Sequence, residues 1–120
     1  MISEIKQRLE TLGYTAKAED DVFIAFVLEK TNERIKIFTN QSVVPEELKY
    51  EIIDAVVGEF MLAKLATGGL DVERAVQSIS EGDTSVTFAS GSDGASILKR
   101  YYESLALNVA KLVKFRVMTW

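Results

Sequence analysis

Hydrophobic residues recur every three or four positions along most of this chain, which is the spacing of helices with one buried face. The first such stretch is ISEIKQRLETL, where Ser3 is a candidate N-cap and Gly13 suits the end of the helix. The apolar residues on its predicted buried face are Ile2, Ile5, Leu9 and Leu12. The sequence therefore predicts an opening amphipathic helix of about three turns.

A second helix is predicted to begin at Asp20 and Asp21, because carboxylates suit a helix N-terminus. The polar residues 39–42, TNQS, end it. Its first half contains VFIAFVL and is apolar on nearly all sides, which predicts central burial of this half. The second half, EKTNERIKIF, is amphipathic.

A third helix is predicted from Pro45, with Glu46 and Glu47 in its first turn, to the stop at Gly68 and Gly69. The residues of its predicted buried stripe are Leu48, Ile52, Ala55, Val56, Phe60 and Ala63.

The last predicted helix begins near Ser96, and lysines and arginines occupy its other faces. The apolar positions that predict it are Ile97, Tyr101, Leu105, Val109 and Leu112. The final residues, KFRVMTW, suit either a short strand or a frayed terminus.

One segment, VQSISEGDTSVTFASGSDGAS at residues 76–96, departs from the helical pattern. Two short runs of strand-type residues flank Glu81-Gly82-Asp83, and Thr84, Val86 and Phe88 alternate with polar residues. Small residues follow in a loop-like composition, and residues 71–75 suit one helical turn. The pattern predicts a β-hairpin, with Gly82 in a turn of unusual backbone angles.

The predicted fold is therefore mainly α: one domain, residues 1–120, forming a small four-helix bundle with a short β-hairpin or extended loop before the last helix. A two-stranded hairpin is marginally stable alone, so it needs a partner for its unpaired backbone groups. Strand addition to a neighbouring copy is one solution, and packing on the helices of its own chain is the other.

The chain contains no cysteine and no histidine, which excludes disulfides, Ser-His-Asp and Cys-His sites, and the usual transition-metal ligands. No phosphate-loop, dinucleotide or calcium-loop spacing occurs, and the acidic pairs at residues 20–21 and 46–47 are explained by helix starts. We therefore predict a protein that is not an enzyme, with no metal and no cofactor. Catalysis by carboxylates alone would need a cleft with a strongly raised carboxyl pKa.

The net charge is −4, but it is unevenly spread. Residues 69–94 carry five acidic side chains and one basic, whereas residues 95–120 carry five basic and one acidic. The basic residues form no dense run, and Tyr101, Tyr102 and Phe115 suit a core or an interface better than base stacking. The longest apolar run is far shorter than a membrane span, and the start lacks a signal peptide pattern, so the sequence predicts a soluble, unexported protein.

Four segments occur in a suggestive order: ISEIKQRLETLGY, then EDDVFIAFVLEKTNERIKIFTNQ, then VPEELKYEIIDAVVGEFMLAKLATGG, then VQSISEGDTSVTF before a small-residue loop and a helix with two tyrosines. In this order they resemble the head–tail connector (head-completion adaptor) proteins of long-tailed bacteriophages. The resemblance spans nearly the whole chain, and SISEGDTSVTF is its most specific part.

The resemblance implies a structural protein of the virion neck, made in the cytoplasm of the bacterial host. Such proteins form a ring, dodecameric in the virion, under the portal protein. The ring extends the channel through which double-stranded DNA passes without specific recognition, joins the head to the next neck or tail-completion protein, and involves no membrane. The resemblance also implies subunit contacts within residues 78–88, for which the predicted interface positions are Ser78, Ile79, Gly82, Val86 and Phe88.

The charge asymmetry fits this expectation, because an acidic channel lining repels the DNA backbone and lets it slide. Glu81 and Asp83 are accordingly predicted to face the channel. The basic residues predicted to contact the portal or stabilise the ring are Lys99, Arg100, Lys111 and Lys114. The alternative hypothesis is a small acidic helical regulatory protein that binds another phage or host protein.

Overall fold

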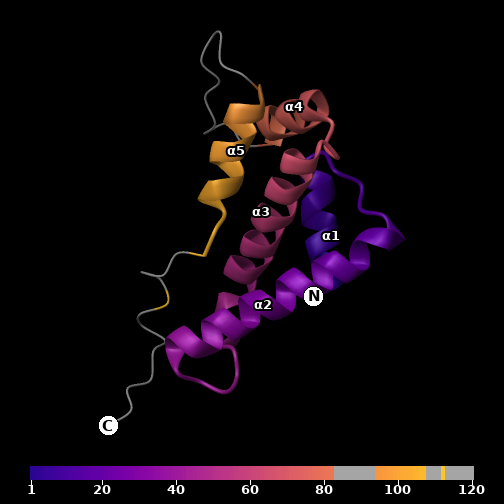
Figure 1. Ribbon diagram of the computed structural model, residues 1–120. Coiled ribbons are helices and arrows are strands. Elements are labelled where there is room, and N and C mark those ends of the chain that lie inside the picture. Colours follow the sequence, from indigo (N-terminus) through magenta and orange to yellow (C-terminus); the bar gives the residue numbers. More distant parts are fainter. Residues whose placement is uncertain (83–93, 108–111, 113–120) are drawn as a thin grey trace.

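The computed structural model describes residues 1–82, 94–107 and 112, and these residues are mainly helical (Figure 1). The α-helices are α1 (Ile2–Thr11), α2 (Asp21–Thr39), α3 (Lys49–Thr67), α4 (Val72–Gly82) and α5 (Gly94–Ser104). Two 3-10 turns, η1 (Ala18–Asp20) and η2 (Glu46–Leu48), lead into α2 and α3. The described ranges contain no β-strand.

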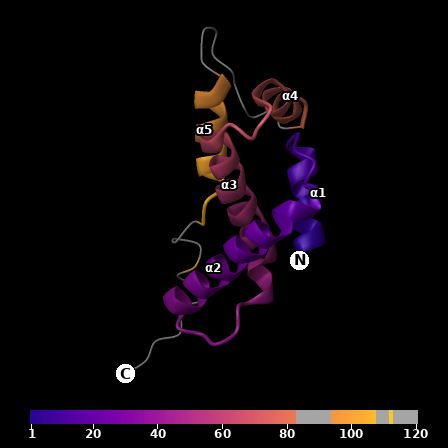
Figure 2. The ribbon, with the colours of Figure 1, turned by 45° about the vertical axis from the view of Figure 1, so that its right-hand side comes forward.

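Helix α3 is the centre of the fold (Figures 1 and 2). It contacts α1, α2 and α5, while α4 packs against α5 and α1. Two different faces of α3 serve α2 and α5. Lys64 and Thr67 lie beside Phe23 of α2, whereas Leu62 and Leu65 lie beside the start of α5. At 3.6 residues per turn these two pairs point to opposite sides of α3, so α2 and α5 flank it.

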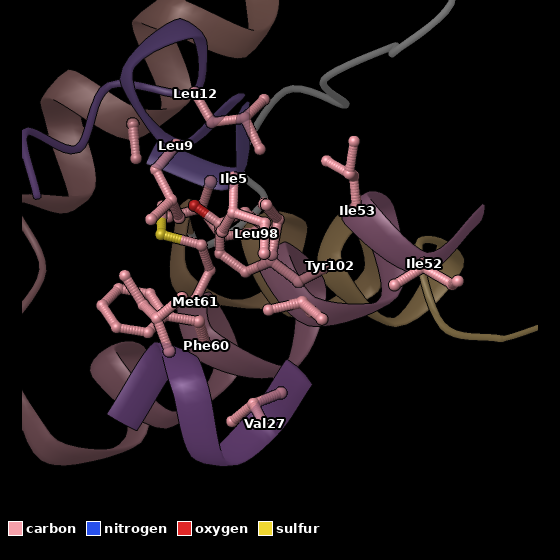
Figure 3. Packing of buried hydrophobic residues seen from close by; sticks show 14 of the residues in the cluster. Ile5, Leu9, Leu12, Val27, Ile52, Ile53, Phe60, Met61, Leu98 and Tyr102 are labelled. Carbon is pink, nitrogen blue, oxygen red and sulfur yellow. The ribbon is translucent and has the colours of Figure 1, made fainter. Parts of the chain in front are cut away.

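The hydrophobic core joins all these helices around α3 (Figure 3). The side chains that fill it include Ile5 and Leu9 from α1, Val27 from α2, Phe60 and Met61 from α3, and Leu98 and Tyr102 from α5. The close approach of α5 to α3 depends on Gly58. A Cβ atom at Gly58 would lie 2.7 Å from the carbonyl oxygen of Tyr102 and 3.0 Å from the Cβ of Leu105.

Several predicted helix ends are confirmed. Gly13 and Gly68 have φ values of 89° and 77°, a left-handed conformation that glycine adopts without strain. Asn40, in the predicted TNQS stop, ends α2 with φ 56°. The third helix also follows Pro45, but its first turn, with Glu46 and Glu47, is a 3-10 turn. The last helix ends at Ser104, earlier than its apolar pattern predicted.

The first strand of the predicted hairpin is wrong, because Val72–Gly82 form the helix α4. Ser78 and Ile79 lie within this helix, and Gly82 is its last residue. The segment forms a helix because its apolar residues also fit a helical period. One face of α4 carries the apolar positions Val72, Ala75, Val76 and Ile79, which are spaced by three, one and three residues. On this face Ala75 and Ile79 are buried.

Helix α4 begins after Asp71, whose Oδ1 accepts a hydrogen bond from the backbone N–H of Arg74 at 3.2 Å. The single turn predicted at residues 71–75 is therefore the start of a fifth helix, and the described part of the chain is not a four-helix bundle. The second predicted strand, with Asp83, Val86 and Phe88, lies outside the described residues, as do Lys111, Lys114 and Phe115.

The predicted central burial of the first half of α2 is also wrong. Ile24 and Val27 are fully buried, but Val22 and Phe26 are 80% and 59% exposed. The cause is the position of α2 at the edge of the fold, where only one face meets α3. None of the helices in the described ranges combines the length and the apolar character that crossing a membrane requires.

Candidate interaction surfaces

The outward side of α2 carries a continuous row of exposed side chains, which we call the α2 strip. Its members are Val22, Phe26, Glu29, Glu33 and Ile37. They are spaced by four, three, four and four residues, so they lie along one side of the helix. Ile37 is 79% exposed, similar to Val22 at the other end. The α2 strip thus presents three large apolar side chains to solvent, with two carboxylates between them.

The opposite side of α2 fixes this orientation. Ile24, Val27, Thr31 and Ile35 are buried at helical spacing. An ion pair between Lys30 and Glu59 of α3, with 2.6 Å from Nζ to Oε2, holds the middle of the helix. Rotating α2 to bury the strip would expose this buried face and break the ion pair. The exposure of these apolar side chains is therefore a stable property of the fold. Val22 and Phe26, one helical turn apart, make the strip a candidate interaction surface.

A groove lies on the other side of α3, where α5 begins, and we call it the α3–α5 groove. It has a volume of about 320 Å³ and is lined by Leu62, Leu65, Ala66, Ala95, Ser96 and Lys99. Its floor is mostly apolar, and Lys99 supplies a positive charge at its edge. Lys99 and the adjacent Arg100 are exposed, and neither forms an ion pair with a described residue.

The predicted interface residues Ser78 and Ile79 lie in a helix, not in a strand at a subunit contact. The side chain of Ile79 is buried in the core, so it is not available to a second copy while α4 stays folded. Ser78 is half-buried and lies close to Gly13, where a Cβ atom would come within 2.7 Å of the Ser78 Oγ. Glu81 lies in the last turn of α4. Of the predicted basic contacts, Lys99 and Arg100 are consecutive residues of α5, and both are exposed.

The α2 strip does not follow from the sequence pattern, because the apolar run VFIAFVL predicts burial of Val22 and Phe26 together with their neighbours. A signal for it does exist in the sequence. Glu29 and Glu33 continue the row that Val22 and Phe26 begin, and charged residues at those positions place that side of the helix in solvent.

One buried charge, Asp20, lies where the connector from α1 enters α2. It is only 4% exposed. Its Oδ2 accepts hydrogen bonds from the Tyr14 hydroxyl at 2.8 Å and from the backbone N–H of Lys17 at 3.0 Å. Its Oδ1 pairs with Nζ of Lys64 on α3 at 3.1 Å. Asp20 was predicted to cap α2, but its side chain makes no cap hydrogen bond to that helix and instead ties the connector to α3.

The electrostatics of this cluster oppose a catalytic role for Asp20. Burial raises the pKa of Asp20, but the hydrogen bonds from Lys17 and Tyr14 and the ion pair with Lys64 outweigh it, so the pKa is lowered. The same contact with Asp20 raises the pKa of Lys64, while burial and Asp20 raise that of Tyr14. A general acid near neutral pH needs a raised carboxyl pKa, which this site does not provide.

A hollow of about 430 Å³ adjoins the cluster, lined by Glu19, Asp20, Phe23, Ala63, Lys64 and Thr67. Because Asp20 and Lys64 already satisfy each other, the hollow offers a ligand little unpaired charge. The ranges that the structure covers contain no group of three or more acidic side chains able to hold a metal ion. The two interaction surfaces, rather than this hollow, are therefore the candidate functional sites.

Comparison of the chain with models of protein families, with curated protein sequences and with solved structures finds no match in any of the three.

Proposed function

We propose that this chain is a structural subunit of a bacteriophage neck, without catalytic activity. In this proposal it forms a ring under the portal, extends the DNA channel and joins the head to the next neck or tail-completion protein. The observation that carries the proposal is the α2 strip, a partly apolar surface whose orientation the fold fixes and which a protein partner would cover. The four sequence segments resemble head–tail connectors, whose partners are neighbouring copies of the same protein, the portal protein and the next neck protein.

The two surfaces suit a subunit that meets a neighbour on each side. The α2 strip and the α3–α5 groove use helices that flank opposite faces of α3. A subunit in a ring needs two such separate surfaces, because each copy contacts one neighbour before it and one after it. A regulatory protein that binds one partner needs only one, so this geometry favours the ring.

In this neck subunit, residues at and after the end of α4 would have the channel and interface roles that the resemblance implies. Glu81 and Asp83 would line the channel, where negative charge repels the DNA backbone and allows it to slide. Val86 and Phe88 would contact a neighbouring copy. Val86→Asp or Phe88→Asp should then leave the protomer folded and prevent its assembly, which circular dichroism and assembly on portal rings would measure separately.

The experiment that tests the function is binding to the portal protein from the same genome. Purified portal rings are mixed with the chain, separated by size-exclusion chromatography and viewed by electron microscopy. We expect the chain to elute with the portal and to form discrete rings that cap one end of it. Persistent failure to bind would overturn the neck assignment, and binding to a DNA-binding protein of the same genome instead would favour the regulatory alternative.

A further inference from the structure

We infer that copies of this chain join head to tail, with the α2 strip of one copy seated in the α3–α5 groove of the next. This inference rests on the proposed ring and names the two surfaces that build it. It assigns Phe26 as the central anchor and Glu29 and Lys99 as the charged residues at the edge of the contact.

The two surfaces complement each other in shape and polarity. Phe26 is the second residue of the α2 strip, and its side chain is 59% exposed. The groove offers apolar side chains, Leu62, Leu65 and Ala66, in a hollow of about 320 Å³. Aromatic anchors that enter an apolar pocket are the usual centres of binding energy in protein interfaces. Val22, one turn before Phe26, would cover the end of the same hollow.

The two surfaces also carry opposite charges. Glu29 lies three residues after Phe26 on the same side of α2 and forms no ion pair within the described ranges. Lys99 lines the groove and is likewise unpaired there. Seating Phe26 in the groove would place Glu29, about one turn farther along the same side of α2, toward the part of the groove that Lys99 lines. Opposite charges at the rim of an interface set the partner and its register.

The same charges disfavour pairing of the strip with itself. A two-fold contact between two α2 strips would bring Glu29 and Glu33 of one copy toward the same carboxylates of the other. Like charges placed across an interface are unfavourable. A contact between different surfaces, in contrast, repeats from copy to copy and produces a ring if its rotation closes. The structure therefore favours a head-to-tail repeat over a symmetric dimer.

Cysteine cross-linking tests this geometry directly, because the natural chain contains no cysteine. Four samples are treated with a short bismaleimide cross-linker at assembling concentration: Glu29→Cys, Lys99→Cys, an equimolar mixture of these two, and the double variant Glu29→Cys/Lys99→Cys. The matched control is Glu29→Cys/Glu47→Cys, in which the second cysteine replaces an exposed glutamate on η2, outside the groove.

Head-to-tail contact predicts a different product for each sample on a denaturing gel. Each single variant should stay monomeric, the mixture should give covalent dimers only, and the double variant should give a ladder of covalent oligomers. The control pair should give no ladder. Dimers from Glu29→Cys alone would show a symmetric contact and overturn the inference, as would a ladder of equal strength from the control pair or no cross-linking of the double variant.

Portal binding separates this inference from the proposed function. A chain that caps portal rings but forms no ladder would keep the neck role and lose the strip-to-groove contact. A chain that forms the ladder but ignores the portal would keep the contact and lose the neck role.

Discussion

Gly58 of α3 lies directly under Tyr102 of α5, so that a Cβ atom at Gly58 would come within 2.7 Å of the Tyr102 carbonyl oxygen. This contact sets the spacing between the two helices that form the α3–α5 groove. We expect Gly58→Ala to lower the free energy of unfolding by about 1–2 kcal/mol, because the overpacking cost exceeds the gain in helix propensity. Urea denaturation measures it, and an unchanged or increased stability would contradict the close packing.

The Tyr102 hydroxyl is buried and finds no hydrogen-bond partner among the residues described, while its ring lies in the core with Ile5, Met61 and Leu98 (Figure 3). Burial, with a smaller effect of Tyr101, raises the pKa of Tyr102. Since an unsatisfied buried hydroxyl costs about 1–3 kcal/mol, we expect Tyr102→Phe to leave the thermal midpoint unchanged or to raise it.

The contrasting variant at this position is Tyr102→Leu, which removes most of the ring as well as the hydroxyl. It should lower stability markedly, because it leaves a cavity in the core. If Tyr102→Phe lowered the midpoint as much as Tyr102→Leu, the hydroxyl would have to be hydrogen-bonded in solution.

The contacts of Asp20 with Tyr14, Lys17 and Lys64 should make the free energy of unfolding depend on pH. The folded-state pKa of Asp20 is lowered from its ordinary value of 3.8, so its stabilising contribution is fully present above that value and is lost as the pH falls through the folded pKa. We expect Asp20→Asn to lower the free energy of unfolding at pH 7 by about 1–3 kcal/mol, since Lys64 loses its charged partner. The difference from the natural chain should shrink below about pH 4.

The matched control for Asp20 is Glu19→Gln, which removes a neighbouring carboxylate that is exposed and makes no ion pair within the described ranges. Its stability should follow that of the natural chain at every pH. Denaturant midpoints are measured from about pH 2 to pH 7. If Asp20→Asn shows the same pH dependence as the natural chain, the contacts of Asp20 do not stabilise the fold.

The α2 strip should affect assembly without affecting folding. Phe26→Lys removes the proposed anchor and adds a positive charge that opposes Lys99. Because Phe26 is largely exposed, the free energy of unfolding should change by no more than about 0.5 kcal/mol, while self-association measured by sedimentation velocity is lost. Val43→Lys is the control, since Val43 is 72% exposed, more than Phe26, but lies outside the strip, and it should associate normally.

Some parts of this fold follow from the sequence because local chemistry dictates them. Gly13, Asn40 and Gly68 end their helices at the predicted places, since few residues accept a positive φ. The mainly helical class follows from the apolar spacing. The error at Ile79 arose because isoleucine and valine favour strands on average, whereas the packing of α4 against α1 and α5 decided the conformation here.

The surfaces were harder to predict because exposure depends on which elements surround a helix. The sequence around Phe26 is equally compatible with a central helix and with an edge helix, and only the position of α2 relative to α3 distinguishes them. The α3–α5 groove brings Leu62 next to Lys99, residues far apart in the chain, so no local pattern could reveal it. The prediction that Lys99 and Arg100 act at a contact stays open to test.

Exchange of the charges of Glu29 and Lys99 tests whether the α2 strip of one copy contacts the α3–α5 groove of the next. Each rim ion pair contributes less than about 1 kcal/mol, but the pair repeats at every contact around a ring. In electron micrographs of portal rings mixed with each variant, we expect Glu29→Lys or Lys99→Glu alone to leave most portals uncapped. The double exchange should restore closed caps. Equal capping by all three variants would contradict the strip-to-groove contact, and no capping by the natural chain would contradict the neck role.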